Sequence, residues 1–252
     1  MPLTFAHPAI ILPLNSLSKR YISLTGLIVG SVVPDFEYFI RMKVYSIYSH
    51  TWFGLLWFDL PLAIALTFVY HGLVRDRLIA NLPSALYKRL TPYTQFNWNQ
   101  YFAKYFFVVI ISVLIGAASH LFWDSFTHIN GYFVSAWGMS REASILGLHL
   151  PLYKFIQHIS TLLGGMVVII ALLKLPVLLC NRSKVVFHYW FGISTVVVVI
   201  LVLRVMLGLA VTQYPNLIVT ALSGFITGII LMPVVYRVST KKEFDRLGKL
   251  PK

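Results

Sequence analysis

Two histidines and an aspartate recur at helical spacing between Gly116 and His128. His120, Asp124 and His128 are four residues apart, and residues at this spacing lie on one face of an α-helix. The segment closes an apolar run, and an ionised carboxylate near hydrocarbon is costly unless it has a partner. Histidine nitrogens and carboxylate oxygens suit zinc and other borderline divalent ions, which activate water at neutral pH. The spacing therefore predicts half of a metal site.

The composition is that of a protein that crosses a membrane several times. Of the 252 residues, 58% are hydrophobic and 12% are charged, and the mean hydropathy is +0.77. Several apolar runs approach the roughly 20 residues that a spanning helix needs. We predict an all-α fold, a multi-pass membrane helical bundle with about five spans and short re-entrant or interfacial helices.

The expected spans lie near residues 52–72, 105–126, 156–179, 188–212 and 217–236. A further apolar run, from Ser23 to Val33, is too short to span, and its length fits a buried or re-entrant helix. We expect two regions. Residues 1–160 form a metal-site region that includes the first two spans, and residues 161–252 form a three-span region with a basic C-terminal tail.

The net charge of +13 indicates how the chain meets its surroundings. Basic residues gathered between apolar segments are typical of membrane orientation and of contact with anionic headgroups. We expect the lipid bilayer as a partner and no nucleic acid, because no soluble basic domain is available to bind it. The single Cys180 excludes an internal disulfide and a cysteine-based zinc module. The sequence does not predict an oligomeric state.

The same basic residues predict an orientation. If loop 73–104 is cytoplasmic, that side also receives the 181–187 turn and the C-terminal tail, with 13 Lys and Arg against six on the other side. The positive-inside rule then predicts a protein of the cell (inner) membrane with a cytoplasmic C-terminus. In this orientation one set of residues lies at the non-cytoplasmic face, namely His50, His120, Asp124, His128 and His149. His7 and Asp35 join them if the first fifty residues stay on that side.

Four short motifs resemble those of a known family. They are Thr4-Phe-Ala-His7-Pro, Gly30-Ser-Val-Val-Pro34-Asp35, Ser49-His50 and His120-Leu-Phe-Trp-Asp124-Ser-Phe-Thr127-His128. Together they resemble an uncharacterised bacterial integral-membrane family, a domain of unknown function related to the membrane-bound metal-dependent hydrolases. Their ligand order is similar to that of zinc-dependent phospholipase C and P1-type nucleases. The resemblance covers roughly residues 1 to 160.

The resemblance implies a centre of divalent metal ions, with zinc as the expected ion. It implies a first metal held by Asp35, His50, His120 and Asp124, a second held by His7 and a bridging Asp124, and a third held by His128 with His149. Asp35 and Asp124 are the expected catalytic carboxylates. The phospholipase pattern has an acidic residue four positions after the last histidine, where this sequence has Tyr153. The implied activity is hydrolysis of a phosphoester, in a lipid or an envelope precursor.

Structural explanations stay open beside this one. Asp35 follows Pro34 and would also cap a turn, and we expect Glu37 to be a solvated carboxylate rather than a general base. Asp59 and Arg204 lie at similar depths in the first and fourth spans, where a buried ion pair would lock two helices together. If they line a polar path, the protein is a transporter. The alternative to a hydrolase is thus a non-enzymatic membrane protein, either a transporter or a protein with a structural metal.

Overall fold

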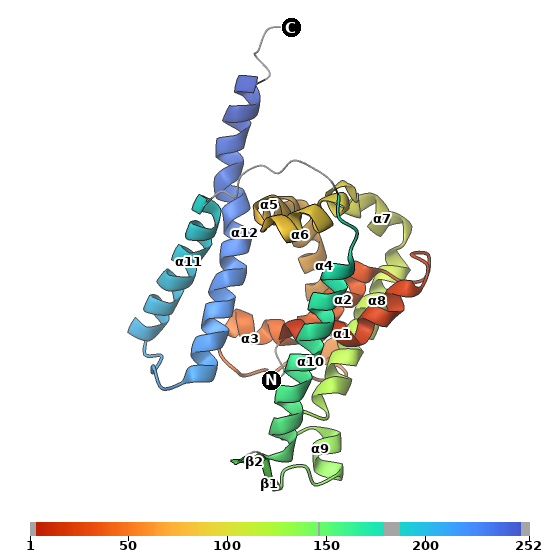
Figure 1. Ribbon diagram of the computed structural model, residues 1–252, viewed down its shortest axis with the longest axis vertical. Helices are drawn as coiled ribbons and strands as arrows, with labels where there is room; N and C mark the ends of the chain where they lie inside the picture. Colours follow the sequence, from red (N-terminus) through yellow and green to blue (C-terminus); the bar gives the residue numbers. More distant parts are fainter. Residues whose placement is uncertain (1–3, 146, 179–186, 248–252) are drawn as a thin grey trace. The chain divides into compact units, whose positions relative to one another are not determined.

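The computed structural model describes residues 4–145, 147–178 and 187–247, and these residues are almost entirely helical (Figure 1). The α-helices are α1 (Pro8–Ile11), α2 (Leu24–Val32), α3 (Phe36–Arg41), α4 (Leu60–Val69), α5 (Arg75–Asn81), α6 (Ser84–Leu90), α7 (Trp98–Lys104), α8 (Phe106–Asp124), α9 (Tyr132–Ala136), α10 (Leu152–Lys174), α11 (Phe187–Met206) and α12 (Tyr214–Leu247). Four 3₁₀ turns are η1 (Thr4–Ala6), η2 (Leu12–Ser16), η3 (Val33–Asp35) and η6 (Thr91–Gln95). Two π-helical turns are η4 (Leu55–Asp59) and η5 (Tyr70–Val74). Strands β1 (Glu142–Ile145) and β2 (Leu148–Pro151) pair as an antiparallel hairpin.

Within these described residues, five helical segments are long and apolar enough to cross a membrane. They are Leu55–Asn81, Phe106–Asp124, Leu152–Lys174, Phe187–Met206 and Tyr214–Val235. The predicted all-α, multi-pass architecture with about five spans is confirmed. The first segment is longer than predicted, because helical turns continue from α4 through η5 into α5. Cys180 and residues 181–186 of the predicted 181–187 turn lie outside the described residues.

The chain divides into two compact units, each interleaved in sequence with the other. Unit 1 consists of Met1–Glu37, Ser46–Thr67 and Asn99–Leu175, and unit 2 of Tyr38–Tyr45, Phe68–Trp98 and Pro176–Lys252. All seven residues predicted to bind metal belong to unit 1. Asp59 belongs to unit 1 and Arg204 to unit 2, so their ion pair stays a prediction.

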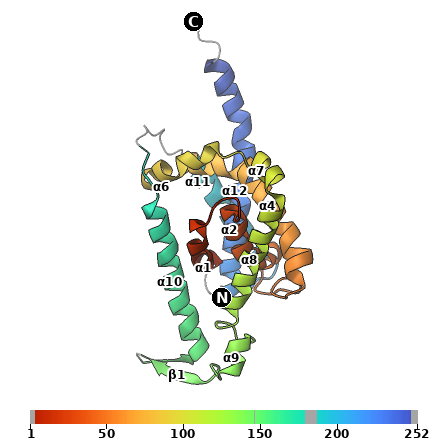
Figure 2. The ribbon, with the colours of Figure 1, turned by 90° about the vertical axis from the view of Figure 1, so that its right-hand side faces the viewer.

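Unit 1 is built on close packing of α2 against α8 (Figure 2). Glycines allow this approach, since a Cβ added at Gly30 would lie 2.2 Å from the Val113 carbonyl oxygen, and one at Gly116 would lie 2.4 Å from that of Leu27. Small residues let helices in a membrane pack backbone against backbone. The start of α2 is fixed by Ser23, whose hydroxyl accepts a hydrogen bond from the Gly26 amide at 3.2 Å. The short apolar run thus forms a helix whose residues are all buried or half-buried.

Unit 2 is dominated by the pair α11 and α12. Glycines again lie at the contact, where a Cβ added at Gly224 would meet the Val197 Cα at 2.9 Å. Arg204 of α11 donates to the Met42 carbonyl oxygen at 3.1 Å. That carbonyl belongs to a residue with a positive φ of 50°. Through this hydrogen bond Arg204 stabilises the turn that follows α3.

Candidate metal centre

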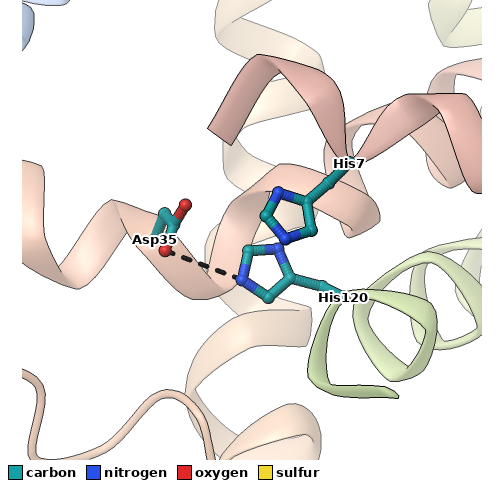
Figure 3. A group of neighbouring side chains, drawn as sticks. All are labelled: His7, Asp35 and His120. Atoms are coloured by element: carbon teal, nitrogen blue, oxygen red, sulfur yellow. Dashed lines mark ion pairs between the residues drawn. The ribbon is translucent and has the colours of Figure 1, made fainter. Parts of the chain in front are cut away.

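Four separate stretches of unit 1 bring ligand-type side chains together. His7 stands where η1 meets α1, Asp35 closes η3 at the end of α2, and His120 and Asp124 occupy the last turns of α8. His50 comes from the loop before η4. In Figure 3 the side chains of His7, Asp35 and His120 point toward one another. Two groups within this cluster, His7 with Asp35 and His120, and His50 with His120 and Asp124, have ligand atoms within 4.8 Å of one another.

Four of these atoms form a closed ring of short distances. The Asp35 Oδ1 atom lies 3.4 Å from His50 Nε2 and 3.6 Å from His120 Nε2. Asp124 Oδ2 lies 3.6 Å from His50 Nε2 and 3.2 Å from His120 Nε2. Four donors bound to zinc in a tetrahedron at about 2.0–2.1 Å are about 3.3–3.4 Å from one another. The four measured edges of the ring are close to this spacing.

The second oxygen of Asp124 faces two other histidines. Asp124 Oδ1 lies 3.2 Å from His7 Nε2 and 3.3 Å from His128 Nδ1. The His7 ring stacks on the His120 ring, with centroids 3.8 Å apart and planes inclined by 13°. Asp124 thus has one oxygen on the ring of four atoms and one oxygen on His7 and His128, which is the arrangement of a bridging carboxylate.

Two hydrogen bonds orient the side chains of His120 and Asp35, so that the other polar atom of each side chain faces the cluster. The Nδ1 atom of His120 donates to the Ser31 carbonyl oxygen at 2.8 Å, and because a carbonyl only accepts, the proton of a neutral ring is on Nδ1. Thr4 Oγ1 donates to Asp35 Oδ2 at 2.5 Å. Within the described residues, the remaining atoms His120 Nε2 and Asp35 Oδ1 are buried without a hydrogen-bond partner. A lone pair that faces carboxylate oxygens is unfavourable unless a proton or a metal ion lies between them.

The charges of the cluster shift the pKa values of its loop residues. Burial raises the pKa of Asp35, but the charges and hydrogen bonds of His120 and His50 outweigh burial and hold the pKa well below its usual range. Burial lowers the pKa of His50, but the carboxylates of Asp124 and Asp35 raise it above its ordinary value of 6.5. Both shifts arise because carboxylates and imidazoles share one buried space.

The cluster is closed except at two histidines. The side chains of His120 and Asp35 are 0% exposed, whereas those of His50 and His128 are 17% and 27% exposed. Both histidines lie outside the spanning helices, His50 before η4 and His128 after α8. These two histidines therefore form the most exposed edge of the cluster.

His149 is the predicted ligand that the structure does not bring to the cluster. It is exposed on β2, opposite Ser144 of β1. No hydrogen bond or ion pair within the described part of unit 1 joins it to His128. Tyr153, which stands where the phospholipase pattern has an acidic residue, is buried in an apolar cluster with Val134 and Met139. That position is part of a small core.

Glu37 is not the solvated carboxylate that we expected. Its side chain is buried, with 2% exposure. It accepts hydrogen bonds from the backbone amides of Ile47, Tyr48 and Ser49 at 2.8–2.9 Å. The expectation was wrong because an acidic residue on a short helix gives no sign, in sequence, of a loop that folds back ten residues later. The one signal available was its place two residues after Asp35.

Asp59 is a second buried carboxylate near the cluster. It lies in the π-helical turn η4, which packs against α8 and η3, and its exposure is 0%. Neither of its oxygens has a hydrogen-bond partner among the described residues. π-Helical turns inside longer helices occur frequently at functional sites. Asp59 therefore lies in the interior of unit 1 and not at its surface.

Comparison with models of protein families gives a match over most of the chain. The family described as Domain of unknown function (DUF4184) matches residues 1–238, a range that includes every residue of the cluster. Searches among curated proteins and among solved structures found no match. None of these comparisons links the chain to metal-dependent hydrolases, so that resemblance stays a prediction from the four motifs.

Proposed function

We propose that the chain, which belongs to the DUF4184 family, is a metal-dependent hydrolase of the membrane that acts on a phosphoester. The observation that supports the proposal is the ring formed by Asp35, His50, His120 and Asp124, whose four edges measure 3.2–3.6 Å. Two nitrogens and two oxygens at this spacing fit zinc. The family itself has no assigned function, so the proposal rests on the site.

The residues present fit a pair of divalent ions. Asp35, His50, His120 and Asp124 would hold the first, while His7 and the other oxygen of Asp124 would hold the second. When bound, such ions supply a hydroxide nucleophile at neutral pH and stabilise the charge of a phosphoryl group. The protein's part is to keep the ligands fixed, through the bonds from Thr4 to Asp35 and from His120 to Ser31.

The proposed substrate is a phosphoester of a lipid or of an envelope precursor. Exposed aromatic side chains beside the open edge support an amphiphilic molecule, since Trp52 and Phe53, two and three residues after His50, are 69% and 73% exposed. Aromatic residues of this kind are enriched where a membrane meets water. With a phosphoryl group bound between His50 and His128, the apolar part of the substrate would lie along the rings of Trp52 and Phe53.

The proposed location is the inner membrane, with the site facing the non-cytoplasmic side and the C-terminus in the cytoplasm. This orientation rests on the excess of Lys and Arg in loop 73–104 and in the C-terminal tail. His50 precedes the first span and Asp124 ends the second. The two positions lie on one side of the membrane if both segments span it.

A hydrolysis assay tests the proposal. Detergent-solubilised protein is depleted with a chelator, reloaded with zinc, and assayed with p-nitrophenyl phosphate and bis(p-nitrophenyl) phosphate. We expect zinc-dependent turnover of at least one probe, lost in His120→Ala and kept in His158→Ala, a change at an exposed position on α10 of the same unit. Turnover that survives both chelation and His120→Ala contradicts the proposal. A protein that holds zinc but hydrolyses neither probe favours the non-enzymatic alternative.

A further inference from the structure

The loop that carries His50 is tied to the buried carboxylate of Glu37. Glu37 Oε1 accepts from the Ile47 amide at 2.9 Å, and Oε2 accepts from the amides of Tyr48 and Ser49 at 2.9 and 2.8 Å. Three successive backbone N–H groups aimed at one anion form a nest, in which each hydrogen bond is strengthened by the charge. Glu37 ends the first segment of unit 1, and the loop opens the second segment at Ser46. The Glu37 carboxylate therefore connects two segments of unit 1 that are separated in sequence by residues 38–45 of unit 2.

The residue after this nest has an unusual backbone conformation. His50 has a φ of +59°, a left-handed conformation that a side chain with a Cβ rarely adopts. Such a conformation persists only where the surroundings over-determine it. The Ser49 hydroxyl, next to the last amide of the nest, lies 2.9 Å from His50 Nδ1. The nest therefore fixes both the backbone that precedes His50 and the group that contacts its ring.

A second restraint follows on the other side of His50. Thr51 Oγ1 accepts from the Gly54 amide at 2.9 Å and donates to the Tyr48 carbonyl oxygen at 3.1 Å. A Cβ added at Gly54 would lie 2.0 Å from that same carbonyl oxygen. His50 is held between the Glu37 nest and this tight turn. Its Nε2 atom consequently stays within 3.4–3.6 Å of Asp35 Oδ1 and Asp124 Oδ2.

We infer that Glu37 is a positioning residue of the metal centre, which holds His50 in its ligating orientation and does not itself bind the metal. The inference rests on the proposed metal centre. Both Glu37 oxygens are occupied by backbone amides, and Glu37 is in neither of the two groups whose ligand atoms converge. Asp35, two residues earlier, faces the cluster. The Pro34-Asp35-Phe36-Glu37 segment therefore supplies one ligand directly and fixes a second ligand through a loop.

Substitution by glutamine isolates this role. In Glu37→Gln one oxygen becomes an NH₂ group, which would face a backbone N–H, and the negative charge of the nest is lost. His50 then loses the restraint on one side. Removing a partner that orients a metal ligand usually weakens metal affinity by about 10- to 100-fold, and we expect a loss of this size.

The experiment measures zinc affinity of the full-length protein in detergent, by competition with a coloured chelator. The variants are Glu37→Gln, His50→Ala and the two combined, with Glu142→Gln as a matched control at an exposed acidic position of unit 1. Glu37→Gln and His50→Ala should each weaken affinity, and the double variant should be no weaker than His50→Ala alone, because both remove the same ligand. Glu142→Gln should bind zinc as the wild type does. The absorption spectrum of the cobalt-loaded protein should change in the same way in Glu37→Gln and His50→Ala.

Two results overturn the inference. The first is a Glu37→Gln protein with wild-type zinc affinity and a wild-type cobalt spectrum. The second is an equal loss of affinity when Glu37→Gln is added to His50→Ala, since this would mean that Glu37 acts on the whole fold. If Glu37→Gln does not fold, Glu37→Asp keeps the charge, and its smaller loss must again vanish in the His50→Ala background. A wild-type protein without zinc affinity refutes the proposed function itself, which separates the two failures.

Discussion

His120 Nδ1 lies 2.8 Å from the Ser31 carbonyl oxygen, and this hydrogen bond joins the last turn of α2 to the last turns of α8. It exists only because the two helices approach closely at Gly30 and Gly116. The bond sets the tautomer of His120 and directs Nε2 toward Asp124. The packing of two helices thus determines which nitrogen is offered to a metal.

The first prediction concerns this packing. Gly30→Ala and Gly116→Ala place a methyl group 2.2–2.4 Å from a backbone carbonyl oxygen of the other helix, so the helices must separate. Overpacking of this kind costs about 1–3 kcal/mol or more. We expect a lower midpoint of thermal unfolding and a loss of bound metal in both variants. Differential scanning fluorimetry and elemental analysis measure the two effects.

Gly165→Ala is the matched control for these glycines. Gly165 lies in α10 of the same unit, and an added Cβ would have no neighbour within 4 Å. Alanine is favoured over glycine in a helix by about 1 kcal/mol, so stability should stay equal or rise. If Gly30→Ala behaves like Gly165→Ala, close approach of α2 and α8 is not what positions His120.

The second prediction is that metal reverses the pH dependence of stability. In the metal-free protein the pKa of His50 is raised above 6.5 by Asp124 and Asp35. Its contribution is therefore complete below pH 6.5 and is lost as the pH rises through the folded-state pKa. The lowered pKa of Asp35 adds stability that is present above its ordinary value of 3.8 and is lost as the pH falls through the folded-state value. The metal-free protein should be most stable between these two ordinary values.

Zinc binding requires neutral histidines, so protons compete with the metal. The zinc-loaded protein should have a higher unfolding midpoint at about pH 8 than at about pH 6, whereas the metal-free protein should have a lower one. Scanning fluorimetry of both forms at the two pH values checks this. Parallel pH profiles with and without zinc would show that the metal does not replace protons at His50.

The third prediction separates the converging histidines from His149. His149 is exposed on β2, so His149→Ala should keep the full metal content and the wild-type unfolding midpoint. His7→Ala removes a buried ring that contacts Asp124 at 3.2 Å and stacks on His120, and it should lose at least one metal ion. Elemental analysis of both variants decides. Metal loss in His149→Ala equal to that in His7→Ala would restore His149 as a ligand.

The fourth prediction concerns orientation. In a Cys180→Ser background, Asn130→Cys and Ser84→Cys each introduce one cysteine at an exposed position. In the proposed orientation the segment that follows the first span is cytoplasmic, so a membrane-impermeant maleimide applied to intact cells should label residue 130 and not residue 84. The reverse labelling pattern would mean that the membrane orientation is opposite to the proposed one and that the site meets a cytosolic substrate.

The sequence predicted the spans because their signal is local. Runs of about 20 apolar residues announce a spanning helix without any knowledge of its neighbours, and α8 and α10 lie within a few residues of the expected bounds. The sequence also predicted that His120 and Asp124 share one helical face, because both residues lie on one helix. The convergence of His7, Asp35 and His50 on that pair was expected only from the predicted orientation and from the resemblance, since these residues come from separate stretches.

What could not be predicted depends on contacts between stretches far apart in the chain. Glu37 was misjudged because its partners are backbone amides ten to twelve residues later, and amides carry no sequence signal. The role of Gly116 likewise depends on the Leu27 carbonyl oxygen of another helix. The resemblance implied that His149 lies with His128, but the hairpin leaves His149 exposed. Local patterns predicted elements, and long-range contacts decided which side chains meet.

The most direct test of the metal centre is the metal content of protein purified without chelators. We expect at least about one zinc ion per chain in the wild type, and less than about half an equivalent in His120→Ala and in Asp124→Ala. His188→Ala, at an exposed position of unit 2, should keep the wild-type content. A wild-type protein with less than about half an equivalent of any divalent transition metal, or an equal loss in all three variants, would contradict the account.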